Sequence, residues 1–497
     1  MAKQRLEEIR KIRLERVKKL RELGIDPYPS KVDGDPKPIS SALKSMGKVA
    51  EVAGRIMGLR THGNVTFADL RDESGTIQLW FQKNNLGEDI KILGYYDIGD
   101  FIYAKGKVVK TKAGETSVDV SKFQLLTKSI RPLPSTWHGL KDIEERYRKR
   151  YLDILINSEV KKRLEVRTRI TSYVREYLDK DGFWEVETPT LQPVYGGGLA
   201  KPFITYHNKL DADFYLRISD EMYLKRMIVG GFEKVYEITK VFRNEGVDFD
   251  HNPEFTMFEA MVAYKDYEYG MDLIEKIIEY TAQKIFGSTN FKYRDIEMDV
   301  KRPWKRYRYV EAIKEFTGID VSGWKKLEEA KNAVKKLDIK EIKIGELEKA
   351  RLIGEVVAFI FEEFVEDKLI QPTIVYDYPI EISPLAKKCK DERFTQRFEM
   401  FAFGSELGNN YSELNDPVDL SKRFIEEKKR EKAGLEEAHQ TDEDYLEAIE
   451  YGFPPTCGIA IGIDRLVMLF TDAPNIKEII TFPTLRPRIN SKKRKKK

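Results

Sequence analysis

Apolar and polar residues alternate with a different period in successive parts of the chain. In residues 3–23 the apolar side chains stand mostly three positions apart, Lys, Arg and Glu fill the positions between them, and Gly24 and Pro27 end the run. This spacing predicts an amphipathic helix with a basic polar face. Such a helix either contacts the backbone of a nucleic acid or packs as a surface helix on its own domain, and the pattern leaves both alternatives open.

A period of two dominates from Val49 to Thr127. Strands are predicted at residues 49–59, 65–70, 76–82, 101–109 and 117–126, with turn signals at residues 72–75 and 112–114. Five strands within about eighty residues are typical of an OB-fold barrel, which commonly binds single-stranded nucleic acid. Arg-Pro-Leu-Pro at residues 131–134 then predicts a stiff linker between domains.

The second half of the chain mixes helical and strand patterns. Residues 160–180 predict an amphipathic helix, residues 265–370 are largely helical in pattern, and a strand-rich pattern resumes at residues 372–384. Residues 232–238 alternate apolar and charged side chains, a turn signal follows at residues 246–250, and residues 254–262 resemble a second strand. We predict a β-hairpin here, with a polar tip.

The tip of this hairpin carries an unusual set of polar groups. The guanidinium of Arg243 suits a phosphate or a carboxylate, the ring of Phe255 offers a face for a base, and Glu245 can accept a hydrogen bond from an exocyclic amine. Together with His251 and Asn252, these groups suit a nucleotide plus a charged small molecule. The alternative is a solvated hairpin with ordinary surface charge.

Composition narrows the class of protein. Of the 497 residues 34% are charged and 41% hydrophobic, as in a globular protein with roughly three domains. The net charge of +4 argues against a general polyanion-binding coat, so any nucleic-acid surface must be local. Cys389 and Cys457 lack a metal-ligand pattern and are expected to be reduced thiols in a cytoplasmic protein. Because no apolar run approaches the ~20 residues of a membrane span, no membrane partner is expected.

Three segments carry a resemblance to a known family. Arg-Asn-Glu-Gly at residues 243–246 and His-Asn-Pro-Glu-Phe-Thr at residues 251–256 resemble motif 2 of the class II aminoacyl-tRNA synthetases, in the form found in lysyl-tRNA synthetases. Residues 182–191, with Pro189, resemble motif 1, and residues 458–466 resemble motif 3. The resemblance extends over nearly the whole chain and implies an α+β protein. It would have an N-terminal five-stranded OB-fold β-barrel plus a class II synthetase catalytic domain, in which helices flank an antiparallel sheet.

The same resemblance implies a division of the chain into five parts. They are a basic amphipathic helix and extension (1–45), an OB-fold anticodon-binding domain (46–130), a linker (131–160), the catalytic domain (161–490) and a basic tail (491–497). We expect the tail to be disordered, and solvated charge is its favoured interpretation over a contact with RNA.

The activity implied by the resemblance is that of a lysine–tRNA ligase. ATP would activate L-lysine to lysyl-adenylate with release of pyrophosphate, and the lysyl group would then pass to the 3′ end of tRNA-Lys. The partners would be ATP, L-lysine, tRNA-Lys and a second copy of the chain in a homodimer, because motif 1 builds the dimer interface in this family. Mg²⁺ would be the cofactor.

The resemblance also implies roles for individual residues. Arg243 is the expected catalytic residue, bridging the lysine carboxylate and the α-phosphate of ATP. The expected ATP-binding residues are Arg243, Glu245, His251, Asn252, Phe255, Glu399 and Arg465, and the expected ligands of Mg²⁺ are Glu399 and Glu406. The expected lysine-binding residues are Gly197, Glu221, Arg243, Glu259, Asn409, Tyr411 and Glu413. The expected anticodon-binding residues are Arg60, Phe67 and Gln78.

Several of these assignments have a plainer alternative. Glu221 stands at a helix start, where a carboxylate is by base rate more often a cap than a ligand. Glu399 and Glu406 could belong to a salt-bridged strand, and Phe67 could belong to the barrel core.

The resemblance also implies a pKa shift in the lysine pocket. Glu259 and Glu413, facing one ammonium group, should repel each other when that group is absent, which raises the pKa of one of the two carboxyl groups.

Four positions depart from the usual pattern of the family. Met261 stands where the family usually has Tyr, and Tyr411 stands where Phe is frequent, so we hypothesise that the pocket hydroxyl has moved to Tyr411. Asp250 replaces a frequent Arg, which puts one contact to the γ-phosphate in question, and Lys201 replaces a usual Arg.

Three other functions fit the same motifs less well. The first is an aspartyl or asparaginyl synthetase with the same layout. An aspartate substrate would bring an anionic side chain to Glu259 and Glu413, which argues against the aspartyl enzyme. A paralogue that lysylates a protein would lack the barrel. A non-catalytic RNA-binding protein that kept the fold would not need the nucleotide-binding residues.

Overall fold

The computed structural model describes residues 2–134, 140, 142–198, 200–337, 341–432 and 442–488. The chain forms two compact units, Met1–Lys141 and Asp142–Lys497, which are described separately. The tail at residues 491–497, expected to be disordered, lies outside the described residues. Within the described ranges, no helix is both long and apolar enough to cross a lipid bilayer.

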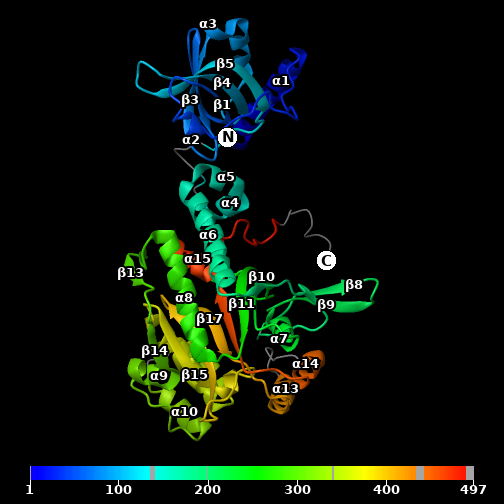
Figure 1. Cartoon of the computed structure of the whole chain (residues 1–497), viewed down its shortest axis with the longest axis vertical. Helices are drawn as coiled ribbons and strands as arrows, with labels where there is room; N and C mark the ends of the chain where they lie inside the picture. Colours follow the sequence, from blue (N-terminus) through cyan, green and yellow to red (C-terminus); the bar gives the residue numbers. More distant parts are fainter. Residues whose placement is uncertain are drawn as a thin grey trace. The chain divides into compact units, whose positions relative to one another are not determined.

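A closed five-stranded barrel forms the body of the first unit (Figure 1). Its strands are β1 (Val49–His62), β2 (Val65–Arg71), β3 (Thr76–Gln82), β4 (Phe101–Lys110) and β5 (Thr116–Thr127), in the order β1-β2-β3-β5-β4. β1 pairs with β4 along its first half and with β2 along its second, and its register shifts between Ile56 and Gly58, where the partner changes. The predicted five-stranded OB-fold barrel is confirmed.

Helix α1 (Ala2–Glu22) packs on the barrel unit through part of its apolar stripe. Val17 and Leu20 are buried, and the guanidinium of Arg13 is buried with them, where it donates to the main-chain carbonyls of Ile98 and Ser129. The alternative of a surface helix packed on its own domain is therefore confirmed, and a nucleic-acid contact stays a prediction. The unit also contains α2 (Ile39–Ala42), α3 (Lys83–Leu86) and η1 (Gly87–Tyr95).

An eight-stranded sheet organises the second unit (Figure 1). Its strands, in spatial order, are β14 (Lys305–Arg308), β15 (Thr373–Pro379), β16 (Phe394–Ala402), β17 (Ser405–Ser412), β18 (Thr456–Gly462), β11 (Glu254–Ala263), β10 (Lys234–Phe242) and β6 (Trp184–Glu185). Neighbouring strands are antiparallel except β14–β15 and β6–β10, which are parallel. The predicted hairpin is β10–β11, whose register pairs Glu237 with Glu259.

Three helices, α6 (Ser158–Lys180), α8 (Tyr267–Phe286) and α15 (Ile463–Thr471), cover one face of this sheet (Figure 1). Phe258 and Ala260 of β11 are buried in the same apolar cluster as these helices, whereas Met257 and Glu259 point to the opposite face, because side chains alternate along a strand. The apolar cluster therefore fixes the register of β11: a slip by one residue would bury Glu259 among the helices.

The remaining elements flank this sheet. Residues 265–370 are largely helical, as predicted, with α9 (Tyr309–Thr317), α10 (Leu327–Val334), α11 (Glu341–Lys349), α12 (Ile353–Phe364), η2 (Glu366–Lys368) and the short strands β12 (Asn290–Tyr293) and β13 (Ile296–Asp299). α7 (Glu221–Val229) packs on β10 and β11, and α14 (Glu443–Glu450) lies between α7 and α13 (Pro417–Lys432). α4 (Ile143–Arg148) and α5 (Arg150–Ile156) precede α6, and η3 (Ile380–Ile382) and α16 (Ile476–Ile479) follow β15 and α15.

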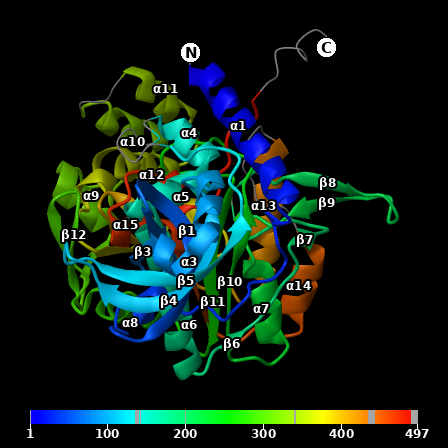
Figure 2. The ribbon, with the colours of Figure 1, turned by 90° about the horizontal axis from the view of Figure 1, so that it is seen from above.

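A three-stranded sheet stands apart from the main sheet. It contains β7 (Leu191–Gln192), β8 (Ile204–His207) and β9 (Ala212–Leu216) in the order β7-β9-β8. The β8–β9 hairpin projects as an arm from the body of the second unit (Figure 2). With helices flanking a largely antiparallel sheet in this unit and a barrel in the other, the predicted α+β class is confirmed.

Candidate active site

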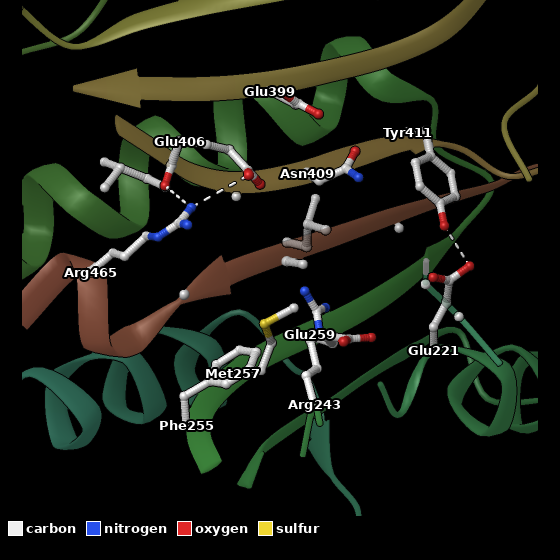
Figure 3. Close-up of a pocket in the computed structure, with 18 of the residues that line it drawn as sticks. Glu221, Arg243, Phe255, Met257, Glu259, Glu399, Glu406, Asn409, Tyr411 and Arg465 are labelled. Atoms are coloured by element: carbon white, nitrogen blue, oxygen red, sulfur yellow. Dashed lines mark hydrogen bonds and ion pairs between the residues drawn. The ribbon is translucent and has the colours of Figure 1, made fainter. Parts of the chain in front are cut away.

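A cavity of about 370 Å³ opens on the sheet face to which Glu259 points. Every residue predicted to bind ATP, lysine or Mg²⁺ lines it: Gly197, Glu221, Arg243, Glu245, His251, Asn252, Phe255, Glu259, Glu399, Glu406, Asn409, Tyr411, Glu413 and Arg465. Figure 3 shows Arg465 and Phe255 toward one end of the cavity and Tyr411 and Glu221 toward the other. The structure thus brings together residues that lie more than two hundred positions apart in the sequence.

The end of the cavity at Arg465 is built where β18 turns into α15. Asp464 holds this junction in place, because its carboxylate accepts from the main-chain N–H of Thr256 at 2.5 Å and pairs with Nη1 of Arg167 at 2.5 Å. Arg465 then reaches across to β17, where its Nη1 donates to the carbonyl oxygen of Glu406 at 2.6 Å. The arginine is therefore fixed at the cavity wall with further donors of its guanidinium available to a ligand.

Arg243 lies in the middle of the cavity, at the end of β10 (Figure 3). Its guanidinium carbon is 5.2 Å from the centroid of the Phe255 ring, and its Nε is buried without a hydrogen-bond partner among the described residues. Burial lowers the pKa of Arg243 from its usual value, although Glu245 and Glu406 act against this effect. A half-buried guanidinium with a buried, unused donor is suited to an anionic ligand.

The loop between β10 and β11 holds three further predicted residues. Asn252 is buried, and its amide donates to the carbonyl oxygen of Glu254 at 2.6 Å, so it shapes the loop. His251 is exposed at the rim of the cavity, with Nδ1 2.9 Å from the carboxylate of Asp248, and Glu245 is also exposed. The contacts predicted for these three side chains with ATP stay predictions.

Glu399 and Glu406 lie on the neighbouring strands β16 and β17. Glu399 accepts from the hydroxyl of Tyr378 at 2.8 Å and forms an ion pair with Arg397, so the salt-bridge alternative holds for this residue. Its pKa is raised because burial, reinforced by Glu406, outweighs Arg397. No group of three or more His, Cys, Asp or Glu side chains arranged to hold a metal occurs in the described part of the chain. Two carboxylates nevertheless fit Mg²⁺, which in nucleotide sites typically takes one or two carboxylates plus phosphate oxygens.

Acidic side chains crowd the opposite end of the cavity. Ser219 Oγ lies 2.9 Å from Oε1 of Glu259, and the hydroxyl of Tyr411 donates to Oε1 of Glu221 at 2.5 Å. Burial, reinforced by Glu221, raises the pKa of Glu259 to about 7. Burial also raises the pKa of Glu413 to about 8, although Lys225 acts against it. Both carboxyl groups therefore bind protons more readily than usual, in the direction predicted for carboxylates that share a site.

Two glycines leave space for these carboxylates, because they have no side chain. Gly197 has a φ of +82°, and a Cβ there would lie 2.7 Å from Oγ of Ser219 and 3.0 Å from Cβ of Glu221. A Cβ at Gly458 would overlap Oε1 of Glu413. Any side chain at either position would displace the acidic groups that form this end of the cavity.

Sequence reasoning missed three charged residues here. Lys225 forms ion pairs with Glu221 and Glu413, each at 2.5 Å, and Arg397 donates through Nε to Oδ1 of Asn409 at 2.9 Å. Their spacing was a usable signal, since Lys225 is one helical turn from Glu221 and Arg397 is two strand residues from Glu399. Asp220 is also buried in this region, and no comparable signal pointed to it.

The predicted anticodon residues lie together on the outside of the barrel. Phe67 is partly exposed between buried neighbours and stacks on Trp80, with the ring centroids 6.2 Å apart, so the alternative of barrel core is wrong. Arg60 pairs with Asp69 at 2.7 Å, and Gln78 accepts from Ser117 Oγ at 2.8 Å. Sequence reasoning missed Trp80, although it follows Gln78 by two residues on the same strand face.

Comparison with known proteins places both units in described families. Residues 142–486 match the family described as tRNA synthetases class II (D, K and N), and residues 50–126 match the family described as OB-fold nucleic acid binding domain. A protein of Thermoanaerobacter pseudethanolicus named lysine–tRNA ligase is 49% identical over 491 residues, which cover 97% of either chain. Proteins of the same name from Carboxydothermus hydrogenoformans and Clostridium botulinum are 48% and 47% identical, over 98% and 97% of this chain and 100% and 97% of their own. The cavity lined by residues of motifs 2 and 3, the barrel and this similarity lead to one conclusion: the chain belongs to the class II tRNA synthetases of the D, K and N group.

Proposed function

We propose that the chain is a lysine–tRNA ligase that activates L-lysine with ATP and transfers the lysyl group to tRNA-Lys. The observation that supports this substrate most directly is the group of three buried carboxylates, Glu221, Glu259 and Glu413, at one end of the cavity. An aspartate side chain would be repelled there. A neutral asparagine side chain would bring no ammonium group to these carboxylates, and a site built for a polar partner discriminates by about 10⁴-fold or more against a ligand that lacks it.

The first step needs no nucleophile from the protein. A carboxylate oxygen of lysine attacks the α-phosphorus of ATP, a new P–O bond forms, and the bond to the β,γ-phosphate breaks to release pyrophosphate. Arg243, central in the cavity and with an unused donor, is placed to bind both the lysine carboxylate and the α-phosphate. The rate then comes from alignment and from charge stabilisation at phosphorus.

The other end of the cavity suits the nucleotide. Phe255 and Arg465 present a ring and a guanidinium to an adenine, Glu245 is proposed to accept from the adenine amine, and His251 to approach the outer phosphates. Glu399 and Glu406 would hold Mg²⁺, which neutralises charge on the phosphates when bound. Asp250, at the rim beside Arg465, offers the γ-phosphate no cation, in contrast to the arginine frequent in the family.

The second step requires tRNA, and the barrel is its proposed anticodon-binding unit. Phe67 and Trp80 form a partly exposed aromatic platform on which a base can stack, with the polar side chains of Arg60 and Gln78 beside it. In the resembled family, positions matching Phe67 and Gln78 face the central anticodon base. A cytoplasmic location is proposed with this function, in keeping with the free thiols of Cys389 and Cys457.

A homodimer is proposed from exposed apolar residues around the motif 1 segment. Trp184, Ile204 and Leu210 are 62–65% exposed, and they lie on β6 and on the β8–β9 arm. A second copy of the chain would remove such large apolar side chains from water, which favours association. Sedimentation of the Ile204→Asp variant should show a shift toward monomer that a charge placed at exposed Ile12 does not produce.

Pyrophosphate exchange with each of the twenty amino acids, followed by charging of total tRNA, tests the proposed function. We expect exchange that depends on lysine and then charging of tRNA-Lys. Exchange with aspartate or asparagine would establish another enzyme of the same group, and the absence of any exchange would establish a binding protein. Lysine-dependent exchange without tRNA charging, but with lysylation of a protein, would establish the protein-modifying alternative.

A further inference from the structure

Lys225 is a fully buried lysine directly behind the acidic end of the cavity. It lies on α7, one turn after Glu221, and none of its surface is exposed. Its Nζ is 2.5 Å from Oε1 of Glu221 and 2.5 Å from Oε2 of Glu413. The rings of Tyr411 and Tyr445 complete its surroundings, with centroids 5.4 Å and 5.8 Å from Nζ. The ammonium thus joins two carboxylates from elements distant in the sequence.

Stability alone is a weak explanation for such a lysine. Removing an ammonium group from water is costly, and apolar residues of similar volume often serve a buried position as well as an ion pair does. Lys225 lies next to the apolar cluster formed by Met222, Leu224 and Ile228 of the same helix, where a methionine would fit chemically. A buried cation retained beside a ligand cavity points instead to a role in binding.

The charges at this end of the cavity reveal that role. Although burial raises the pKa values of Glu259 and Glu413, the ammonium groups of a bound lysine favour their charged forms. With lysine bound, Glu221, Glu259 and Glu413 contribute three negative charges, and Lys225 contributes one positive charge. The remaining two negative charges match the α-ammonium and ε-ammonium groups of L-lysine, while Arg243 is left for the substrate carboxylate. Asp220 is left out of this count, because burial and the nearby Glu259 and Glu237 raise its pKa well above the usual range and so favour its neutral form.

We propose that Lys225 is a specificity-determining positioning residue, whose buried ammonium fixes Glu221 and Glu413 and neutralises the one carboxylate charge that the substrate does not match. This inference rests on the proposed function. Without Lys225, a carboxylate would stay buried without its cation or would take up a proton, and a protonated carboxyl group attracts an ammonium group less because its negative charge is gone. Lys225 acts through Glu221 and Glu413 and touches no reacting atom.

The test compares pyrophosphate exchange by the wild-type enzyme and the Lys225→Met variant. The KM for lysine should rise roughly 30-fold or more, because one partner of a buried ion pair is lost, whereas the KM for ATP should stay within about twofold. Lys331→Met is the matched control, since Lys331 is also buried but lies on α10, where Nζ donates to the carbonyl oxygen of Glu348 at 2.9 Å. It should leave both KM values unchanged.

A double variant separates positioning from folding. In Lys225→Met with Glu413→Gln, both charges are gone, so the protein should fold even if Lys225→Met alone does not. If Lys225 acts through Glu413, the double variant should have nearly the same KM for lysine as Glu413→Gln, because the effects of coupled residues are not additive.

Three outcomes would overturn the inference. They are an unchanged KM for lysine in Lys225→Met, a parallel rise in the KM values of lysine and ATP, and a double variant in which the two effects simply add. Failure of the wild-type enzyme to exchange pyrophosphate with lysine would instead refute the proposed function, so the two failures are distinguishable.

Discussion

The hydroxyl of Tyr411 donates a hydrogen bond of 2.5 Å to Oε1 of Glu221, from β17 to the first turn of α7. The hydroxyl hypothesised to have moved to Tyr411 therefore serves the carboxylate proposed for the α-ammonium of lysine, whereas Glu259 takes a contact from Ser219. Tyr411 and Lys225 meet the same oxygen of Glu221. This arrangement fixes one carboxylate oxygen of Glu221 at the wall of the cavity.

We expect Tyr411→Phe to weaken lysine binding. A hydrogen bond to a charged group contributes about 1.5–3 kcal/mol, so the KM for lysine should rise roughly 10- to 100-fold while the KM for ATP changes little. Pyrophosphate exchange at varied lysine concentration measures the effect. Tyr445→Phe is the control, because Tyr445 also faces Lys225 but lies on α14, outside the cavity lining. An unchanged KM in Tyr411→Phe would end the hypothesis of a relocated hydroxyl.

The raised pKa of Glu259 predicts that kcat/KM for lysine depends on pH. Its pKa is raised to about 7, so the carboxylate takes up a proton as the pH falls through this value and no longer attracts the ε-ammonium. We expect kcat/KM for lysine to decrease below about pH 7, since this quantity reports the pKa values of the free enzyme. The dependence on pH should be weaker in kcat at saturating lysine, because the bound ammonium favours the charged carboxylate.

The Glu259→Gln variant tests the same residue without titration. This variant should lose lysine activation far more than ATP binding. A plot of its residual kcat/KM for lysine against pH should lack the decrease below about pH 7 that we attribute to Glu259. A profile in Glu259→Gln that matched the wild type would assign the pKa to another group. Near-normal lysine-dependent exchange by this variant would refute the role of Glu259 altogether.

Arg397 connects the two halves of the cavity. Its Nε donates to Oδ1 of Asn409 on the lysine side, and its Nη2 forms an ion pair with Glu399 on the Mg²⁺ side. Because lysine at this position cannot make both contacts, Arg397→Lys should raise the KM values of lysine and ATP together, by roughly tenfold each. Arg393→Lys, which changes an exposed arginine just before β16, is the control. A rise confined to one substrate would show that Arg397 serves only one side.

The raised pKa of Asp220 predicts that the free energy of unfolding changes with pH. Its folded-state pKa lies well above the ordinary value, chiefly because of burial and then because of Glu259, so ionisation opposes folding. The stabilisation from the protonated form is complete below the unfolded-state pKa and is lost as the pH rises through the folded-state pKa. Asp220→Asn removes this loss and should stabilise the protein at pH 8 by about 1–3 kcal/mol, the magnitude for an unsatisfied buried polar group.

Urea unfolding at pH 5 and pH 8 measures this effect of Asp220→Asn, which should be larger at pH 8. The exposed Asp320 gives a control of opposite sign, since its ion pair with Lys314 lowers its pKa and Asp320→Asn should not stabilise the protein. A gain for Asp220→Asn that was equal at both pH values would contradict the assigned titration.

Local patterns predicted the elements that carry the site better than they predicted the contacts between them. Period-two runs located the barrel strands and the β10–β11 hairpin, and the resemblance to the class II motifs assigned Arg243, Glu259 and Arg465 to one site. Spacing along an element says nothing about which residue of another element lies opposite. Glu221 and Tyr411 are 190 residues apart, so neither their hydrogen bond nor the ion pair of Lys225 with Glu413 could be predicted from the sequence.

Phe67 provides a test of the barrel that leaves the catalytic unit untouched. Its ring is partly exposed and stacked on Trp80, and a stacked base contributes roughly 1–3 kcal/mol. Phe67→Ala should therefore raise the KM for tRNA in the charging reaction roughly 5- to 150-fold, while lysine-dependent pyrophosphate exchange without tRNA stays at the wild-type level.

Tyr28→Phe is the control for this variant, because it keeps the exposed ring of Tyr28 and removes only its hydroxyl. Phe123→Ala is unsuitable as a control, because Phe123 packs against the barrel cluster. If charging by Phe67→Ala were as efficient as by Tyr28→Phe, the anticodon would have to bind elsewhere on the barrel, because an exposed ring that stacks on a base cannot be removed without loss of affinity.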